Sequence, residues 1–158
     1  MFSLERIESY RENDRLEAKL ATGGLPESLW ESYSAFANTY GGIILLGVEE
    51  LPDHTLRIQG LLDAQEMLEE FLSMVQDPAV VSVDLMSEGR AAIEPTPDGD
   101  IIVIQVPWAE AAVRPVYIGK DPYRGTYRRK GDGDIRCRPD EVDAMLEAAR
   151  EAGGAADL

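Results

Sequence analysis

The chain has 158 residues, of which 44% are hydrophobic, and its formal net charge at pH 7 is −15. This length predicts one globular domain with a buried core, and the absence of an apolar run of about 18 residues excludes a membrane-spanning helix. The excess of negative charge argues against binding a polyanion over the whole surface, because like charges repel.

The N-terminal third is predicted to contain two helices and two strands. Residues 4–10 form a short amphipathic helix. Residues 15–21 alternate polar and apolar side chains, as a strand with one buried face does. Residues 26–40 form a helix that a proline opens and a glycine ends. Residues 43–48 are continuously apolar, which is typical of a strand buried on both faces.

The rest of the chain is predicted to add shorter strands and two more helices. Residues 64–75 form a helix with Asp63 as its N-cap, and Glu66 three positions later completes a capping box. A last helix covers residues 139–150, with a proline in its first turn. Further strands are expected at residues 56–58, 80–85, 91–94, 101–106, 116–118 and 126–129.

Helices and strands do not alternate regularly in this pattern, which predicts an α+β fold with a mixed β-sheet flanked by helices. Residues 1–150 are expected to form a single domain, and residues 151–158, which are mostly small, a flexible tail. The one cysteine, Cys137, cannot form an internal disulfide, which fits a cytoplasmic protein.

Three carboxylates and a lysine in the first fifty residues are the candidate catalytic group. Glu12 precedes the first strand, Glu17 and Lys19 lie on one face of it, and Glu49 follows the second strand. If the strands are neighbours, these acids converge, and a metal ion, a lysine or a substrate cation must offset their repulsion. The alternative is a set of solvated surface acids, with Glu17 and Lys19 in a surface ion pair.

The segment 114–138 has eight basic and three acidic side chains, a local net charge of +5, so the remainder carries −20. Two interpretations stay open, namely a basic face that contacts phosphates, or arginines that pair with surrounding acids. Tyr123 and Tyr127 lie among these cations, as in single-stranded nucleic-acid binders, but edge-strand packing explains them equally well. Trp30 and Trp108 are assigned to the core or its rim. The candidate nucleic-acid contacts are Arg114, Lys120, Arg124, Arg128, Arg129, Lys130 and Arg136.

A series of short motifs follows in a fixed order. They are Glu12, Glu17-Ala18-Lys19, Ala37-Asn38-Thr39-Tyr40-Gly41-Gly42, Gly47-Val48-Glu49-Glu50, Gly60-Leu61, Ile104-Gln105-Val106-Pro107, Pro115-Val116-Tyr117 and Tyr127-Arg128-Arg129-Lys130-Gly131. In order and spacing these motifs resemble the Schlafen-type AlbA domain, over roughly residues 10–147. That family is also described as a DNA-binding domain or as a divergent AAA protein.

The resemblance implies a Schlafen AlbA-like fold and a role for the acids. In Schlafen nucleases three acids form a metal-dependent RNA-cleaving site, and by position they are Glu12, Glu17 and Glu49 here. They would hold Mg²⁺ or Mn²⁺, and Lys19 would stabilise the charge that develops on the phosphate. The chain departs from the family pattern in two places: Ala18 replaces a core phenylalanine, and Glu49-Glu50 replaces a pair of aspartates.

The first expectation is therefore a nucleic-acid-binding (DNA-binding) domain of a bacterial transcriptional-regulator type. The second is an ATP-binding or protein-interaction module without catalysis, although no Walker A loop occurs. The third is a metal-dependent ribonuclease of Schlafen type, and only this one requires a cofactor. The expected partner is DNA or RNA and not a membrane, and a homodimer would place two basic faces on one ligand.

Overall fold

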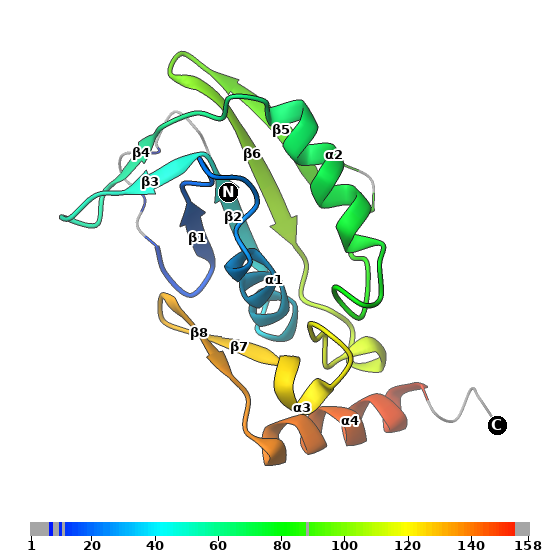
Figure 1. Cartoon of the computed structure of the whole chain (residues 1–158). Helices are drawn as coiled ribbons and strands as arrows, with labels where there is room; N and C mark the ends of the chain where they lie inside the picture. The colour runs from blue at the N-terminus through cyan, green and yellow to red at the C-terminus, as the bar shows by residue number, and fades with distance from the viewer. Residues whose placement is uncertain (1–6, 8–9, 11, 88, 154–158) are drawn as a thin grey trace.

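The computed structural model describes residues 7, 10, 12–87 and 89–153, and its centre is a four-stranded mixed sheet (Figure 1). The sheet confirms the predicted α+β architecture, because its first pair of strands is parallel and the others are antiparallel. In spatial order the strands are β1 (Leu16–Lys19), β2 (Gly42–Leu46), β6 (Gly99–Val106) and β5 (Ala91–Thr96).

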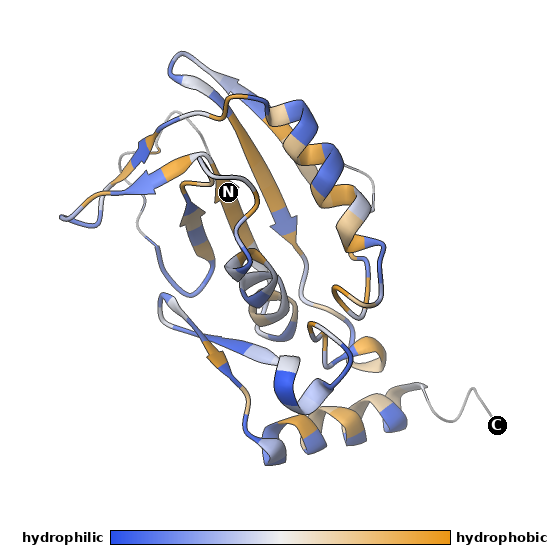
Figure 2. Cartoon of the chain, viewed as in Figure 1, coloured by the Kyte–Doolittle hydropathy of each residue, from blue (hydrophilic) through white to orange (hydrophobic). Residues whose placement is uncertain are grey.

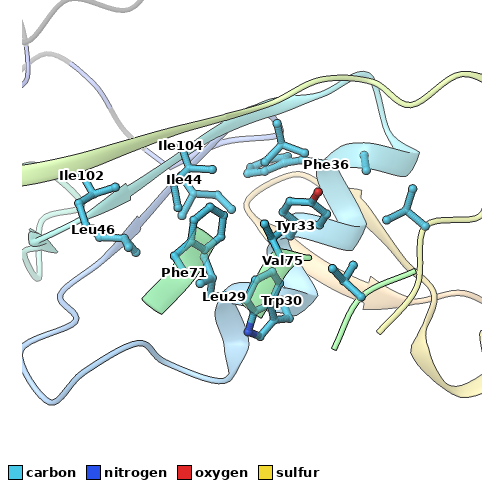
Figure 3. Close-up of a cluster of buried hydrophobic side chains, with 14 of the residues drawn as sticks. Leu29, Trp30, Tyr33, Phe36, Ile44, Leu46, Phe71, Val75, Ile102 and Ile104 are labelled. Atoms are coloured by element: carbon cyan, nitrogen blue, oxygen red, sulfur yellow. The ribbon is translucent and has the colours of Figure 1, made fainter. Parts of the chain in front are cut away.

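One face of the sheet is covered by two helices, α1 (Ser28–Asn38) and α2 (Ala64–Val75). The predicted cap of α2 is present, since Asp63 Oδ1 accepts a hydrogen bond of 3.0 Å from the Glu66 amide. Figure 3 shows the side chains of both helices meeting those of β2 and β6. Trp30 lies here, stacked on Phe71 with 5.3 Å between the ring centroids, so its assignment to the core is confirmed.

The opposite face of the sheet is covered by a separate hairpin, β3 (Val48–Glu50) paired with β4 (Leu56–Ile58). Leu45 points to this face whereas Ile44 and Leu46 point to the helices, so β2 is buried on both faces as predicted. The predicted strand 43–48 is nevertheless interrupted. Gly47 has a φ of +91°, which directs the chain out of the central sheet and into the hairpin.

The C-terminal part forms a second layer below the sheet in Figure 1, where β7 and β8 pair as a ribbon beside the last helix. Its elements are η2 (Ala111–Val113), α3 (Pro122–Gly125), β7 (Tyr127–Lys130), β8 (Gly133–Arg136) and α4 (Pro139–Gly153). The sequence patterns did not predict α3 or β8. The last helix extends three residues into the predicted tail, and residues 154–158 lie outside the described part, as does most of the predicted helix 4–10.

The predictions of strands at 80–85 and 116–118 were wrong, because these segments share only single bridges with neighbours. The hydroxyl of Ser82 accepts from the Tyr117 amide, so a side chain takes the place of a backbone acceptor and the ladder stops. The Tyr33 hydroxyl, from α1, donates to Val83 O and accepts from the Leu85 amide. This segment is therefore held by side chains of the core rather than by a strand partner.

Figure 2 shows hydrophobic residues along β2 and β6 and hydrophilic ones along β7, as expected for a buried sheet beside a ribbon with one exposed face. No helix in residues 12–87 and 89–153 has the length and apolarity needed to cross a bilayer.

One side chain, Asn38 at the end of α1, joins the two layers. Its Nδ2 donates to the carbonyls of Val116 and Tyr127, each at 2.9 Å, and its Oδ1 accepts from the Val116 amide at 2.9 Å. These three hydrogen bonds lie in a partly buried environment, where an unpaired donor or acceptor lowers the stability of the fold.

We expect Asn38→Ala to lower the free energy of unfolding by about 2 kcal/mol, because the Val116 amide and the Tyr127 carbonyl lose their partner, whereas the Val116 carbonyl keeps the Ser34 hydroxyl. Urea denaturation measures this loss. Asp63→Ala, which removes only a helix cap, is the control and is expected to cost about 1 kcal/mol. Equal losses in the two variants would contradict the role given to Asn38.

Candidate functional site: an acidic cluster and a basic ribbon

The side chain of Arg129, on β7, is completely buried and connects the ribbon to the edge of the sheet. Its Nη1 lies 2.9 Å from Glu17 Oε1 and 2.7 Å from Asp134 Oδ1. Its Nε and Nη2 donate to the Asn13 carbonyl, at 3.1 and 2.8 Å, and Nη2 also reaches Leu16 O at 3.2 Å. The predicted phosphate contact through Arg129 was therefore wrong, since protein groups take up its donors.

The predicted acids are brought together in part, and Arg129 supplies the cation that their convergence requires. Glu17 contacts Arg129 and also lies 3.6 Å from Lys19 Nζ. Lys19 in turn donates to Ser28 Oγ at 3.1 Å. Glu12 Oε2 accepts from the Ala18 amide at 3.0 Å, which places it beside the strand that carries Glu17. The expected Glu17–Lys19 ion pair exists, but it is mostly buried rather than on the surface.

Burial and, after it, the negative charge of Glu17 raise the pKa of Glu12 from 4.5 to about 7. The hydrogen bond from the Ala18 amide acts against these effects. Glu12 therefore takes up a proton as the pH falls through about 7, and the protonated carboxyl can share that proton with Glu17. The arrangement can hold and release one proton between two carboxylates.

Glu49 is not the third member of the acidic cluster. It lies on the β3–β4 hairpin, where its Oε1 is 2.6 Å from Arg57 Nη2 on the paired strand. Side chains alternate along a strand, so Glu50 shares a face with buried Val48, and its charge is one of those that raise the pKa of Glu12. Glu50, which also lies 3.6 Å from His54 Nδ1, is thus the acid of β3 nearest in effect to Glu12.

These contacts do not fit the metal site that the family resemblance implies. Within residues 12–87 and 89–153 no three Asp, Glu, His or Cys side chains are grouped so that they could share an ion. Glu17 is already neutralised by Arg129, and Glu49 by Arg57. An ion between Glu12 and Glu17 would have to compete with a buried guanidinium.

The predicted nucleic-acid contacts fall into two groups. Arg128 pairs with Glu141 of α4 at 2.9 Å, and Arg114 lies over the ring of Trp108, so both are engaged within the fold. The side chain of Arg124 is 87% exposed, with a long contact of 3.7 Å to Asp121. The guanidinium carbon of Arg136 lies over the Tyr127 ring, 6.0 Å from its centroid. The exposed cations, here called the basic surface, are Lys120, Arg124, Lys130 and Arg136.

Sequence reasoning missed three participants of this site. Asp134 was counted only as a negative charge, yet it binds Arg129 and accepts from Ser32 Oγ at 2.6 Å. Asn13 contributes its carbonyl oxygen, which no side-chain pattern reports. Glu50 was named but not selected, and the alternation of β3, once its partner strand was recognised, could have identified it.

Comparison with known proteins places these features in context. The family model described as Schlafen, AlbA_2 matches residues 9–138. The solution structure of the N-terminal domain of a RecG-related protein from Nitrosomonas europaea, a protein described as an ATP-dependent DNA helicase relative, is similar. Its TM-score is 0.61 at 30% identity, with 87% of this chain and 94% of that chain covered.

A second solved structure shares the fold. The crystal structure of the DIP2311 protein from Corynebacterium diphtheriae has a TM-score of 0.56 at 19% identity over 87% of this chain. The match spans only 24% of that chain. No curated protein sequence matches this one significantly.

The raised pKa of Glu12 predicts a pH dependence of stability. The folded state binds the proton more tightly than the unfolded state, so the stabilisation is complete below about pH 4.5 and is lost as the pH rises through about 7. Glu12→Gln keeps an acceptor for Ala18 and a donor for Glu17 at every pH. We expect it to be more stable than the parent at about pH 8, by the order of 1 kcal/mol given partial solvent exposure, in thermal unfolding.

Glu69→Gln, at an exposed position of α2, is the control for removing one negative charge. Parallel pH profiles for the parent and Glu12→Gln would contradict a shared proton at this site.

Proposed function

This chain belongs to the Schlafen AlbA_2 family, and on that premise we propose that it is a nucleic-acid-binding domain whose basic surface contacts phosphates. The observation that carries the proposal is the difference in burial among the cations of residues 114–138. Arg129 is satisfied inside the fold, whereas Lys120, Arg124, Lys130 and Arg136 are exposed.

The ribbon geometry supports this role. In the β7–β8 register Tyr127 is opposite Arg136 and Lys130 is opposite Gly133, so the two exposed cations lie near opposite ends of a short ribbon. They are on different faces of it, because Lys130 alternates with buried Arg129 while Arg136 lies over Tyr127. A ribbon with a cation on each face can meet phosphates on two sides, as strands do in nucleic-acid grooves.

The relatives support the same class of ligand. The Nitrosomonas europaea domain, which is 30% identical, comes from a protein related to a DNA helicase, so DNA is the first ligand to test. A regulatory role in transcription remains a prediction from the family resemblance, as do a cytoplasmic location and a homodimer. The net charge of −15 repels DNA at a distance, so binding must come from local contacts of exposed cations with phosphates, and such contacts weaken as the salt concentration rises.

The ribonuclease alternative has one feature in its favour, the proximity of Glu12 to Glu17, whose negative charge helps to raise the pKa of Glu12. We derive no reaction from it, because the carboxylates do not fit a metal ion as they are arranged. Incubating RNA with the protein and Mn²⁺ or a chelator tests it. Metal-dependent fragments that Glu17→Gln abolishes would revive it, whereas intact RNA would leave binding as the function.

The salt dependence of DNA binding tests the proposal. Each phosphate neutralised contributes about −0.9 to the slope of log K against log salt concentration. The double variant Lys130→Ala/Arg136→Ala should therefore reduce the slope by about 2 and weaken binding at low salt, as measured by fluorescence anisotropy with labelled duplex and single-stranded DNA.

The matched control is Arg57→Ala/Arg150→Ala, which removes two cations of the same type that are exposed but paired with Glu49 and Glu147. This control has the same net charge as the Lys130→Ala/Arg136→Ala variant, and it should leave the slope of log K against log salt concentration unchanged. Equal losses in the two double variants would show that only total charge matters. Absence of binding by the parent chain would overturn the proposal and direct the search to nucleotide or protein partners.

A further inference from the structure

Two aromatic side chains far apart in the sequence meet on the surface at the ends of α1 and β6. Tyr40 is 60% exposed and Trp108 is 50% exposed. Their ring centroids are 5.1 Å apart with 64° between the planes, an edge-to-face contact. The guanidinium carbon of Arg114 lies 4.8 Å from the centroid of the Trp108 ring. These three residues are here called the aromatic platform.

The backbone holds both rings in place. Ala109 donates from its amide to Ala37 O at 2.9 Å, and Gly41 donates to Phe36 O at 2.8 Å. Gly41 has a φ of +78°, and a Cβ on it would lie 2.8 Å from Val106 O and 2.9 Å from the Trp108 amide nitrogen. Only glycine permits this close approach, which sets the two aromatic residues side by side.

Tyr40 occupies an unusual conformation for an aromatic residue. Its φ is +64°, in the left-handed region that glycine and asparagine adopt readily and bulky residues rarely do. A half-exposed aromatic ring gives little burial in return for that strain. Strained residues of this kind concentrate at ligand-binding positions, which favours a role for the Tyr40 ring in ligand contact over a role in core packing.

The chemistry of the platform selects among ligands. A cationic ligand is disfavoured, because Arg114 already lies over the indole. Arg114 Nε is buried and has no acceptor among the described residues, so the guanidinium is stacked rather than neutralised by a carboxylate. A cavity of about 410 Å³ adjoins Trp108 and is lined by both Arg90 and the acids Asp84 and Glu110. A ligand that offers a planar ring to Tyr40 or Trp108 and an anion to Arg114 fits the two rings and the stacked guanidinium, whereas the acids of the cavity disfavour an anion there.

We propose that the aromatic platform of Tyr40, Trp108 and Arg114 stacks an unpaired base of single-stranded nucleic acid, with the adjoining phosphate near Arg114. The proposal rests on the proposed function and specifies its ligand. The platform lies close to the β7–β8 ribbon. Thr39, which precedes Tyr40 in the chain, accepts a hydrogen bond of 3.0 Å at Oγ1 from the Arg129 amide of β7. A single strand of nucleic acid could thus extend from the basic surface to the two aromatic rings. The assignment of Trp108 to the rim is correct for its burial and incomplete for its role.

The test uses a fluorescein-labelled single-stranded DNA of mixed sequence, the RNA of the same sequence and the corresponding duplex. Tyr40→Gly removes the ring and suits the backbone, so the fold should remain intact by thermal unfolding. We expect Tyr40→Gly and Trp108→Ala each to weaken single-strand binding about tenfold, with duplex binding changed less than about twofold. Trp108→Phe, which keeps a stacking face, should restore most of the loss.

Tryptophan fluorescence gives a second readout, because Trp30 is buried and only Trp108 can be quenched by a stacked base. Quenching by the single strand that disappears in Trp108→Phe supports the proposal. Single-strand binding that is unaffected by Tyr40→Gly and Trp108→Ala but lost in Lys130→Ala/Arg136→Ala overturns the platform and leaves the binding function standing. No binding of any nucleic acid overturns both.

Discussion

The buried guanidinium of Arg129 is the interaction on which the rest of this structure depends. It has no exposed side-chain surface, and it binds two carboxylates and two backbone carbonyls, which come from residues 13–17 and from Asp134 on β8. Its carbon also lies 4.8 Å from the Phe36 ring centroid, against the core helix. A charge is tolerated in such a place only when its donors are all paired. Removing Glu17 or Asp134 would leave the buried guanidinium with one carboxylate in place of two.

This constraint explains why the acidic cluster and the basic ribbon occur together. The ribbon supplies the cation that pairs with Glu17 beside Glu12, and Glu17 in turn fixes the ribbon against β1. Asn38 and Thr39 strengthen the same junction, since they bind the backbones of Tyr127 and Arg129. Several residues of the family motifs thus hold two layers together. The residues free to meet a ligand lie beside them, at Tyr40 and Lys130.

Patterns of residues close in the sequence predicted much of the fold, and the failed predictions concern contacts between residues far apart in the sequence. The helix α2 follows from Asp63 and Glu66, which are close in sequence. The apolar run 80–85 gives no sign that its partner is a tyrosine hydroxyl some fifty positions earlier. In the site, a shift of one position along a strand decides which way a side chain points. Glu49 and Glu50 are adjacent on β3, as Arg129 and Lys130 are on β7, and in each pair the two side chains lie on opposite faces. Composition cannot identify which member of each pair faces the cluster around Glu17 and Glu12, because both residues have the same charge and only the strand register separates them.

The central claim is that Arg129 stabilises the fold while its neighbour Lys130 is available to a ligand. The most direct measurement is the free energy of unfolding, by urea denaturation, of Arg129→Gln beside Lys130→Gln, two changes that remove the same charge from adjacent positions. The structure predicts a loss of about 3–5 kcal/mol for Arg129→Gln and less than about 0.5 kcal/mol for Lys130→Gln. Similar small losses in both variants would contradict the account, because Arg129 would then be a surface cation like its neighbour.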